Sequence, residues 1–244
     1  MARTSKTTST RAARATRVTR ADKEEASRSK QPTGNGSFHI EFKNQAQGLA
    51  WAAFKQHDVL FLTGPAGTGK THLACAFAIE QILTKEKKRI IMTRPVVEAG
   101  ESLGFLPGTF EEKIDPYMMP MYDCMDKLVG KDGPWRDKIN YAMEAAPLAY
   151  MRGRTFDDAI CIFDEAQNAS MMQLKLFMTR FGENSKLIIT GDPSQSDLAG
   201  KVALVDVMQK LHSVDGIGIV EFKPSQIVRH PLISKIIEKL EPQS

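Results

Sequence analysis

Three absences narrow the class of this 244-residue chain. No apolar stretch approaches the roughly 20 residues that a membrane-spanning helix requires. The N-terminus carries no apolar run of the kind found in signal peptides. The only cysteines, Cys75, Cys124 and Cys161, are scattered and show no C-x-x-C spacing for a metal or redox centre. These absences predict a soluble, cytoplasmic protein with no membrane partner.

The positive charge of the chain is concentrated at its N-terminal end. Residues 1–30 contain nine Lys or Arg and three Asp or Glu, a net charge of +6, whereas the whole chain carries +4. Thr, Ser and Ala fill the gaps, so we expect residues 1–36 to form a disordered basic tail. This tail could bind nucleic-acid phosphates or only improve solubility, and the sequence leaves both readings open. The remaining residues, 37–244, are long enough for one substantial folded domain.

The most informative motif is the run of residues 64–71, which reads G-x-x-x-x-G-K-[ST], the phosphate loop. It follows an apolar run at 58–63, typical of a buried parallel strand, and precedes a segment rich in Ala that favours a helix. Such a turn aims backbone N–H groups and a helix dipole at one point. We therefore predict a nucleoside triphosphate site formed by Gly64, Pro65, Ala66, Gly67, Thr68, Gly69, Lys70, Thr71 and His72. Lys70 would contact the β- and γ-phosphates, and the Thr71 hydroxyl would hold Mg²⁺.

A second apolar run, residues 159–163, ends in the acidic pair Asp164 and Glu165. An Asp at the carboxyl end of a strand is where phosphate-loop enzymes hold Mg²⁺, so Asp164 is the second candidate metal ligand. Glu165 could orient and deprotonate an attacking water. Small-molecule kinases of this class usually lack that Glu, because they must exclude water as acceptor. The pair therefore favours hydrolysis over transfer to another substrate.

A third apolar run, residues 186–190, is followed by Gly-Asp-Pro-Ser-Gln, which places Gln195 after a neighbouring strand. A Gln amide can hydrogen-bond both a γ-phosphate oxygen and the attacking water. Gln195 is therefore predicted to sense whether the γ-phosphate is present.

Other segments set the expected elements around these motifs. We expect a short strand at 38–42, a helix at 44–56 and a strand at 88–93. Residues 100–158 interrupt the alternation of strands and helices, and we expect an irregular insertion in which Pro116 and Pro120 break any long helix. The methionines clustered at 118–125 are read first as core residues and second as a subunit interface. Three arginines flanking this insertion are candidate nucleic-acid contacts, namely Arg94, Arg152 and Arg154.

In combination, these motifs resemble the PhoH family over residues 44–240. The resemblance depends on the phosphate loop, on Thr-Arg-Pro at 93–95 and on Gly-Glu-Ser-Leu-Gly-Phe-Leu-Pro-Gly at 100–108. It also depends on segments at 112–117, 146–155 and 179–180, on Gly-Asp-Pro-Ser-Gln at 191–195 and on Val-Arg-His-Pro-Leu at 228–232. Members usually carry an acidic residue where this chain has Gln226, which puts any role of that position in doubt.

The resemblance implies an α/β fold similar to the RecA-like core of superfamily 1 helicases, with helices on both faces of a mostly parallel sheet. In that sheet, the strand before Gln195 lies between the strands before the phosphate loop and before Asp164. The resemblance also implies ATP and Mg²⁺ as cofactors, ATP hydrolysis as the activity, and RNA or another single strand as a partner. Gln45, nineteen residues before Gly64, corresponds to the adenine-reading Gln of related helicases.

A single RecA-like domain lacks the second domain that normally supplies an arginine finger. We therefore expect head-to-tail assembly into a homo-oligomer, a hexameric ring by analogy, in which Arg229 or Arg180 of a neighbour completes each site. Two other readings remain open. The protein could be an ATP-gated RNA-binding module that never translocates, or a phosphoryl-transfer kinase, against which Glu165 and Gln195 argue.

Overall fold

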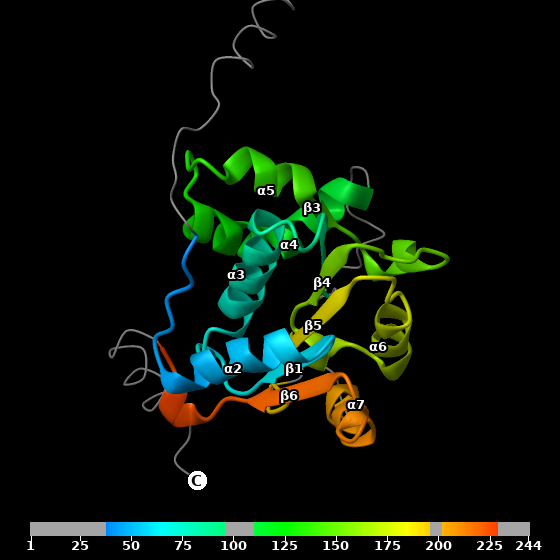
Figure 1. Cartoon of the computed structure of the whole chain (residues 1–244). Helices are drawn as coiled ribbons and strands as arrows, with labels where there is room; N and C mark the ends of the chain where they lie inside the picture. Colours follow the sequence, from blue (N-terminus) through cyan, green and yellow to red (C-terminus); the bar gives the residue numbers. More distant parts are fainter. Residues whose placement is uncertain (1–37, 96–109, 196–201, 229–244) are drawn as a thin grey trace, which may run out of the picture. The chain divides into compact units, whose positions relative to one another are not determined.

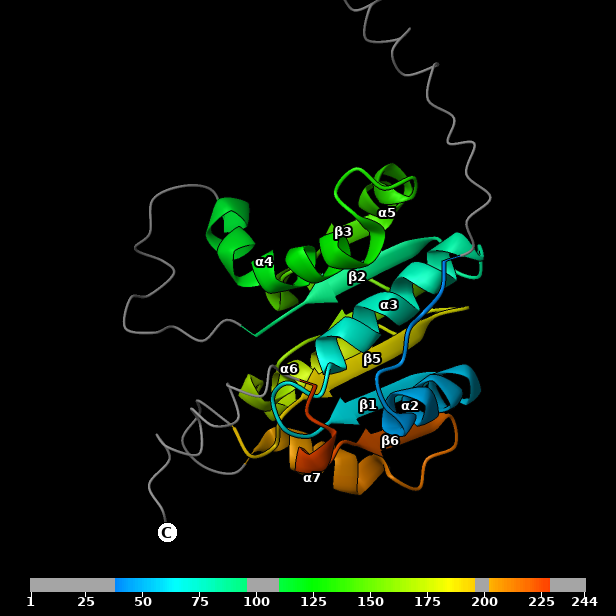
Figure 2. The same cartoon turned by 90° about the vertical axis from the view of Figure 1, so that its left-hand side faces the viewer.

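The structure is a computed structural model, and it describes residues 38–95, 110–195 and 202–228. Six strands form one sheet in the order β3-β2-β4-β5-β1-β6, and every strand pair is parallel. Figures 1 and 2 show this sheet from two directions, with helices on both of its faces. The strands are β1 (Val59–Thr63), β2 (Arg89–Thr93), β3 (Met143–Ala145), β4 (Ala159–Phe163), β5 (Lys186–Gly191) and β6 (Ile217–Glu221).

Helices and short turns cover the sheet or connect its strands within the described part of the chain. The α-helices are α2 (Gln45–Gln56), α3 (Lys70–Leu83), α4 (Phe110–Val129), α5 (Arg136–Ala142), α6 (Met171–Met178) and α7 (Ala203–Leu211). Single 3₁₀ turns occur at η2 (Leu148–Met151), η3 (Ala166–Asn168) and η4 (Pro224–Gln226). Strand β5 lies between β1 and β4, which confirms the strand order implied by the family resemblance.

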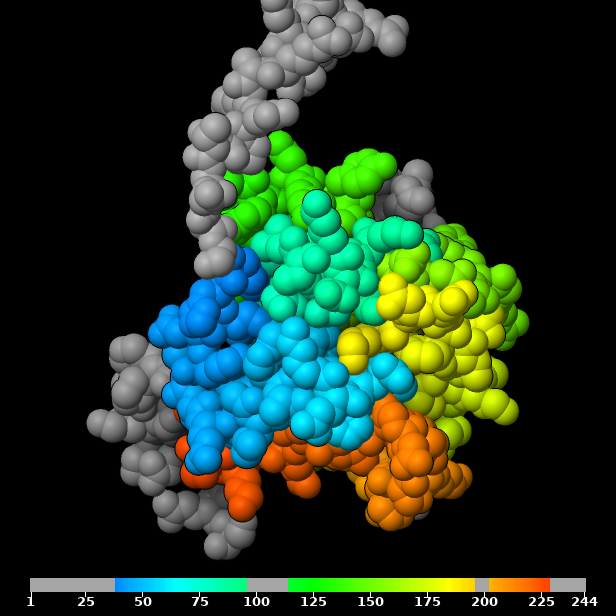
Figure 3. Space-filling model, in the orientation of Figure 1, coloured from blue at the N-terminus to red at the C-terminus, as the bar shows by residue number. Residues whose placement is uncertain are grey.

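The central strands are apolar on both sides, because parallel sheets of this kind are buried on both faces. Leu60 and Leu62 of β1 point into one core, which α2, α3, α4 and α5 cover. Phe61 points into the opposite core, which α6 and α7 cover. The continuous apolar runs of the sequence therefore correspond to strands buried between two helical layers. Figure 3 shows one outer face of this arrangement, where α2 and the start of the sheet (blue to cyan) lie against α3 (teal).

Local signals fix several helix ends. The Asn44 side chain accepts a hydrogen bond from the Gln47 backbone N–H and caps α2, so the helix begins one residue later than expected. Ser170 and Gln173 form a capping box at the start of α6. Ser-x-x-Gln is a sequence signature of a helix N-terminus, so this boundary was open to prediction.

Helix α4 contradicts the expectation that Pro116 and Pro120 break any long helix, because both lie inside its 20 residues. The two prolines are exposed, so the carbonyls that lose their usual donors lie on the solvent side and can bond to water. The opposite face carries apolar residues at helical spacing that are buried against α3 and the first core, namely Ile114, Met118, Met121, Met125 and Val129. Each buried side chain contributes about 1.5–3 kcal/mol, which together exceeds the cost of about 3 kcal/mol for each proline.

Two further expectations need correction. Residues 38–42 form no strand, although Phe38, Ile40 and Phe42 pack against the first core. Their alternation reflects packing on a helical layer and not pairing in a sheet. The supposed irregular insertion is more regular than expected over residues 110–158, where α4, α5, η2 and the edge strand β3 occur. The reading of the methionine cluster as core is confirmed for Met118, since it is 2% exposed, and for the fully buried Met121 and Met125.

Candidate nucleotide site

The phosphate loop connects β1 to α3 and depends on glycines that adopt positive φ angles. Gly64, Gly67 and Gly69 have φ of 129°, 85° and 90°, conformations that side chains rarely adopt. A Cβ at Gly64 would lie 2.3 Å from the backbone oxygen of Phe222, so the loop passes directly against the end of β6. On the same side, the Val228 N–H donates to the Gly67 carbonyl over 2.8 Å. The loop is thus supported by the C-terminal part of the described chain.

Lys70 and Thr68 hold the loop from inside. The Lys70 ammonium donates to the carbonyl oxygens of Gly64 at 2.6 Å and Pro65 at 2.9 Å. Thr68 is fully buried, and its hydroxyl donates to Pro65 O. These hydrogen bonds link the side chains of Lys70 and Thr68 to the backbone of the loop that they belong to. Lys70, at the start of α3, is placed where its charge can reach an anion held by the loop.

Asp164 is the centre of a hydroxyl cluster at the carboxyl end of the sheet. It follows β4 and is 2% exposed. One of its oxygens, Oδ1, accepts hydrogen bonds from Thr71 Oγ1 at 2.7 Å and from Thr190 Oγ1 at 2.5 Å. Among the described residues, no Lys, Arg or His forms an ion pair with this buried carboxylate.

A buried carboxylate without an ion-pair partner is costly, and a bound cation offsets that cost. Thr71 and Asp164 therefore fit Mg²⁺, which typically takes one or two protein oxygens and completes its shell with water and substrate phosphates. The described residues contain no cluster of three or more His, Cys, Asp or Glu that could hold a metal by themselves. The donor set thus suits a metal that arrives with a phosphate ligand.

Glu165 adopts the left-handed backbone conformation, with φ of 53°, just after Asp164. Both of its carboxylate oxygens have partners within the domain. Oε1 lies 3.2 Å from the guanidinium NH2 of Arg94, which follows β2. Oε2 accepts a hydrogen bond from the Gln167 amide at 2.6 Å. The side chain of Glu165 is consequently restrained from two sides.

Gln167 extends this network to the segment that carries Gln195. Its Oε1 accepts from the backbone N–H of Asp192 at 3.0 Å. The Asp192 carboxylate in turn accepts from the backbone N–H and the hydroxyl of Ser194. Gln195 itself is exposed, and its N–H donates to the Asp192 carbonyl at 3.0 Å. The ends of β2, β4 and β5 are therefore connected through side chains.

The predicted residues of three separate motifs meet around one cavity of about 260 Å³. The phosphate loop contributes Lys70 and Thr71, β4 contributes Asp164 and Glu165, and the segment after β5 contributes Gln195. Pro65 and Thr68 support the loop but do not line the cavity, whereas His72 does line it. Thr190 and Gln167 were not anticipated from the sequence. Thr190 is the penultimate residue of β5, and only the strand register shows that its hydroxyl meets Asp164.

Other expected site residues lie elsewhere. Gln45 is exposed and does not line the cavity, whereas Gln47 is 3% exposed and its amide donates to Thr68 O at 3.1 Å. The Arg180 carbonyl accepts a hydrogen bond from the N–H of Phe156, which precedes β4. Arg180 therefore lies near the amino-terminal ends of the strands, opposite the cavity at their carboxyl ends. Its guanidinium donates to the Arg154 carbonyl. Arg229 falls outside the described residues.

All three cysteines are buried and form no disulfide, and Cys75 and Cys161 belong to the two apolar cores. Burial raises the pKa of the Cys161 thiol to about 12. Cys124 differs, because a hydrogen bond from Cys75 and then one from His72 stabilise its thiolate and lower its pKa to about 6. The same Cys75–Cys124 hydrogen bond raises the pKa of Cys75. Of these two thiols, Cys124 is therefore the one whose thiolate is favoured, and its Sγ lies 3.8 Å from Nδ1 of the His72 ring.

The fold and the site together define a phosphate-loop NTPase of the RecA-like class. The sequence profile of the family described as PhoH-like protein matches residues 39–241. The chain is 49% identical over 207 residues to a PhoH-like protein of Bacillus subtilis, which covers 84% of this chain and 65% of that protein. It is 42% identical over 200 residues to Protein PhoH of Escherichia coli K12, covering 80% and 56%. The chain belongs to the PhoH-like family.

Comparison with solved structures supports the fold. The large terminase of a thermophilic bacteriophage superimposes with a TM-score of 0.56 at 10% identity, covering 83% of this chain and 51% of that one. Because the chain spans only about half to two thirds of the length of the curated relatives it matches, these comparisons identify the domain and its family. Within the described residues, no helix has the length and apolarity needed to cross a membrane.

Proposed function

We propose that the chain hydrolyses ATP with Mg²⁺ and that hydrolysis is coupled to binding of RNA or another single-stranded nucleic acid. The main support is the pair of hydroxyl groups, Thr71 and Thr190, that converge on one oxygen of the buried Asp164. A phosphate loop alone indicates nucleotide binding. A buried carboxylate held at the loop's Thr, with Glu165 and Gln195 around the same cavity, favours hydrolysis.

Each residue has a distinct role in this proposal. Bound Mg²⁺ would neutralise phosphate charge while Thr71 and Asp164 hold it. Lys70 stabilises negative charge on the terminal phosphates, because it lines the same cavity as Thr71 and Asp164. Glu165 accepts a proton from the attacking water, and Gln195 orients that water or reports the terminal phosphate. Catalysis is then mainly a matter of positioning and electrostatics.

Gln45 is proposed to read the adenine by its correspondence to the adenine-reading Gln of related helicases, and its exposed position at the start of α2 leaves its amide accessible to a base. The finger arginine is proposed to come from a neighbouring subunit. Arg180 lies at the end of the strands opposite the cavity. A head-to-tail contact would therefore present Arg180 of one subunit to the cavity of the next. Arg229 is the other candidate. A closed ring, with six subunits as the expected number, would satisfy every site, and a monomer with full activity would contradict this assembly.

The test is steady-state ATP hydrolysis with and without single-stranded RNA and single-stranded DNA. Glu165→Gln should lower kcat by about 10²–10⁴-fold while a fluorescent ATP analogue still binds. Stimulation of the wild-type rate by RNA would support coupling of hydrolysis to nucleic-acid binding. A rate that neither nucleic acid changes would contradict this coupling. Absence of hydrolysis in every condition would contradict the ATPase itself. A strand-displacement assay then separates a translocating helicase from an ATP-gated binding module.

A further inference from the structure

We propose that Arg94 is a positioning residue that restrains Glu165, and that a nucleic-acid strand in the adjoining groove activates hydrolysis by drawing Arg94 away. This inference rests on the proposed ATPase activity and names how the nucleic acid would regulate it. Its starting point is the Arg94–Glu165 ion pair, which joins two cavities. Glu165 lines the nucleotide cavity, whereas Arg94 lines a separate pocket of about 160 Å³ at the end of β2.

The restraint on Glu165 is visible in its contacts. A general base needs a carboxylate oxygen directed at the attacking water. Here Oε1 is paired with Arg94 and Oε2 accepts from Gln167, so a water must compete with both partners for the same oxygens. Arg94 is itself oriented by the Tyr117 carbonyl of α4, at 3.4 Å from NH1. Removing Arg94 from Glu165 would free one oxygen for catalysis.

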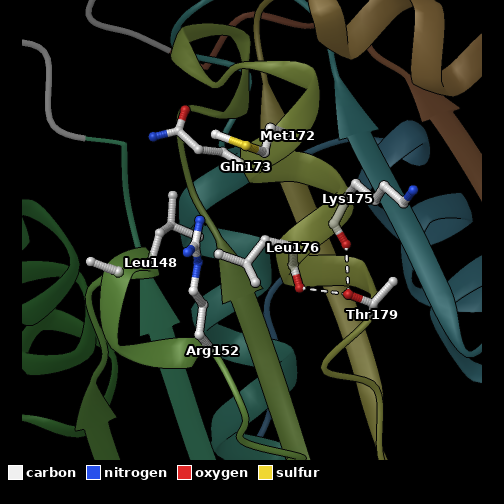
Figure 4. A pocket seen from close by; sticks show the side chains of 8 residues that line it. Leu148, Arg152, Met172, Gln173, Lys175, Leu176 and Thr179 are labelled. Carbon is white, nitrogen blue, oxygen red and sulfur yellow. Dashed lines mark hydrogen bonds between the residues drawn. The ribbon is translucent and has the colours of Figure 1, made fainter.

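The pocket at Arg94 continues into a larger groove. The β2-end pocket shares Leu148, Ala149 and Gln173 with a groove of about 520 Å³ between η2 and α6, here called the η2–α6 groove. In Figure 4 the Arg152 side chain lies between Leu148 and Leu176 of this groove. The Lys175 ammonium points away from it. A continuous surface thus runs from Arg94 towards Arg152.

The charges along this surface suit an anionic occupant. Of the described residues that line either cavity, none is Asp or Glu, whereas Arg94 and Arg152 carry positive charge. Within the described residues Arg152 is exposed and forms no ion pair. Met172, which is 68% exposed, and Leu176 add apolar surface beside the arginine. A single strand combines the two features needed, phosphates for the guanidinium groups and bases for the apolar surface.

A strand that places a phosphate near Arg94 would compete with Glu165 for the same guanidinium. The ion pair is weak enough for such competition, because the Arg94 and Glu165 side chains are 22% and 36% exposed. Release of Glu165 would then couple binding of the nucleic-acid strand to ATP hydrolysis, because Arg94 contacts Glu165 and lines the pocket that continues into the groove. No large conformational change is required for this coupling.

The kinetic test uses Arg94→Gln, with Arg89→Gln as the matched control on the opposite end of β2. Arg94→Gln should raise the basal kcat by about twofold to fivefold and reduce RNA stimulation towards one, while KM for ATP changes little. Arg94→Lys, which retains the charge, should restore part of the stimulation. Arg89→Gln should change neither value. A fall in basal kcat would show that Arg94 supports Glu165 and would overturn the proposal.

A second test does not depend on hydrolysis, so it separates this inference from the ATPase proposal. If binding of the nucleic-acid strand breaks the Arg94–Glu165 ion pair, the strand has to compete with the Glu165 charge for Arg94. Removal of that charge must therefore increase the affinity for the strand. Glu165→Gln should therefore tighten binding of a fluorescent oligouridylate of about 12 nucleotides by about twofold to fivefold, at one fixed salt concentration.

A double-mutant cycle removes the general effect of losing one negative charge. In the Arg94→Gln background, Glu165→Gln should leave the dissociation constant of the oligonucleotide nearly unchanged. An equal tightening in both backgrounds would overturn the proposal, as would no tightening in either.

A last experiment replaces the oligonucleotide with polyglutamate. Stimulation of hydrolysis by this polyanion but not by the oligonucleotide would overturn the proposal and assign the groove to an acidic protein instead.

Discussion

Gly64→Ala is the substitution that most directly tests how the phosphate loop is supported. Gly64 has φ of 129°, a conformation essentially restricted to glycine. A new Cβ would lie 2.3 Å from the Phe222 carbonyl oxygen, 2.9 Å from its Cβ and 3.0 Å from its carbonyl carbon. Two of these three atoms belong to the backbone, and Phe222 N–H donates to Thr63 O at 2.7 Å. The end of β6 therefore cannot move without disturbing the sheet.

The expected cost has two parts. A non-glycine residue in this backbone region costs about 1–3 kcal/mol. Overpacking against fixed neighbours costs about 1–3 kcal/mol more. We therefore expect Gly64→Ala to lower the free energy of unfolding by about 2–6 kcal/mol, a large fraction of the 5–15 kcal/mol typical of a domain. Nucleotide affinity should fall as well, since the loop would shift.

The assay is urea denaturation followed by circular dichroism, with a fluorescent ATP analogue for binding. Gly48→Ala is the matched control, because a Cβ at Gly48 meets nothing within 4 Å and the residue lies inside α2. It should be neutral or stabilise the protein by up to about 1 kcal/mol. If Gly64→Ala unfolds within about 0.5 kcal/mol of wild type and binds nucleotide normally, the reasoning about loop support is wrong.

Three further predictions concern side chains around the site. Gln47→Ala removes the buried amide that donates to Thr68 O, so it should cost about 1–3 kcal/mol in urea denaturation and weaken nucleotide binding; unchanged binding would exclude a supporting role. Thr190→Val keeps the shape but removes a donor to Asp164, the carboxylate proposed to hold Mg²⁺, so the Mg²⁺ concentration needed for half-maximal ATPase should rise, and an unchanged requirement would refute this. The pKa of Cys124 is lowered to about 6 by its Cys75 hydrogen bond, so alkylation measured by mass spectrometry should increase through pH 6 and level off above it; an increase centred near the ordinary value of 9.0 would contradict the pairing.

The site could be predicted where its chemistry is local in sequence. Each parallel strand is a continuous apolar run, so the runs at 58–63, 159–163 and 186–190 were expected to be strands followed by the phosphate loop, Asp164 and Gln195. The structure places these three features around one cavity at the carboxyl ends of the strands. The topology needed the family resemblance, because apolar runs carry no information on strand order.

The expectation of a broken helix at Pro116 and Pro120 was wrong, and the role of Gln45 stays a prediction; both outcomes have physical reasons. Pro116 and Pro120 were expected to break α4 because each proline is costly inside a helix, but the apolar face of α4 that packs against α3 outweighs this cost. Single-residue propensity is a weak guide when tertiary packing opposes it. Gln45 and Gln47 illustrate a finer problem. Two positions along a helix point in very different directions, and only the packing of α2 decides which glutamine contacts the loop.

The connections of Glu165 were beyond the reach of sequence reasoning altogether. Arg94 is 71 residues away in the chain, and the Asp192 backbone that Gln167 contacts is 25 residues beyond Gln167. A motif identifies what one loop can do, whereas these contacts arise because β2, β4 and β5 are neighbours in the sheet. The residues proposed to perform hydrolysis are therefore encoded in short motifs, but the contacts that would regulate them depend on strand order. Loops at the ends of adjacent strands can consequently couple a nucleotide cavity to a neighbouring groove without a separate regulatory domain.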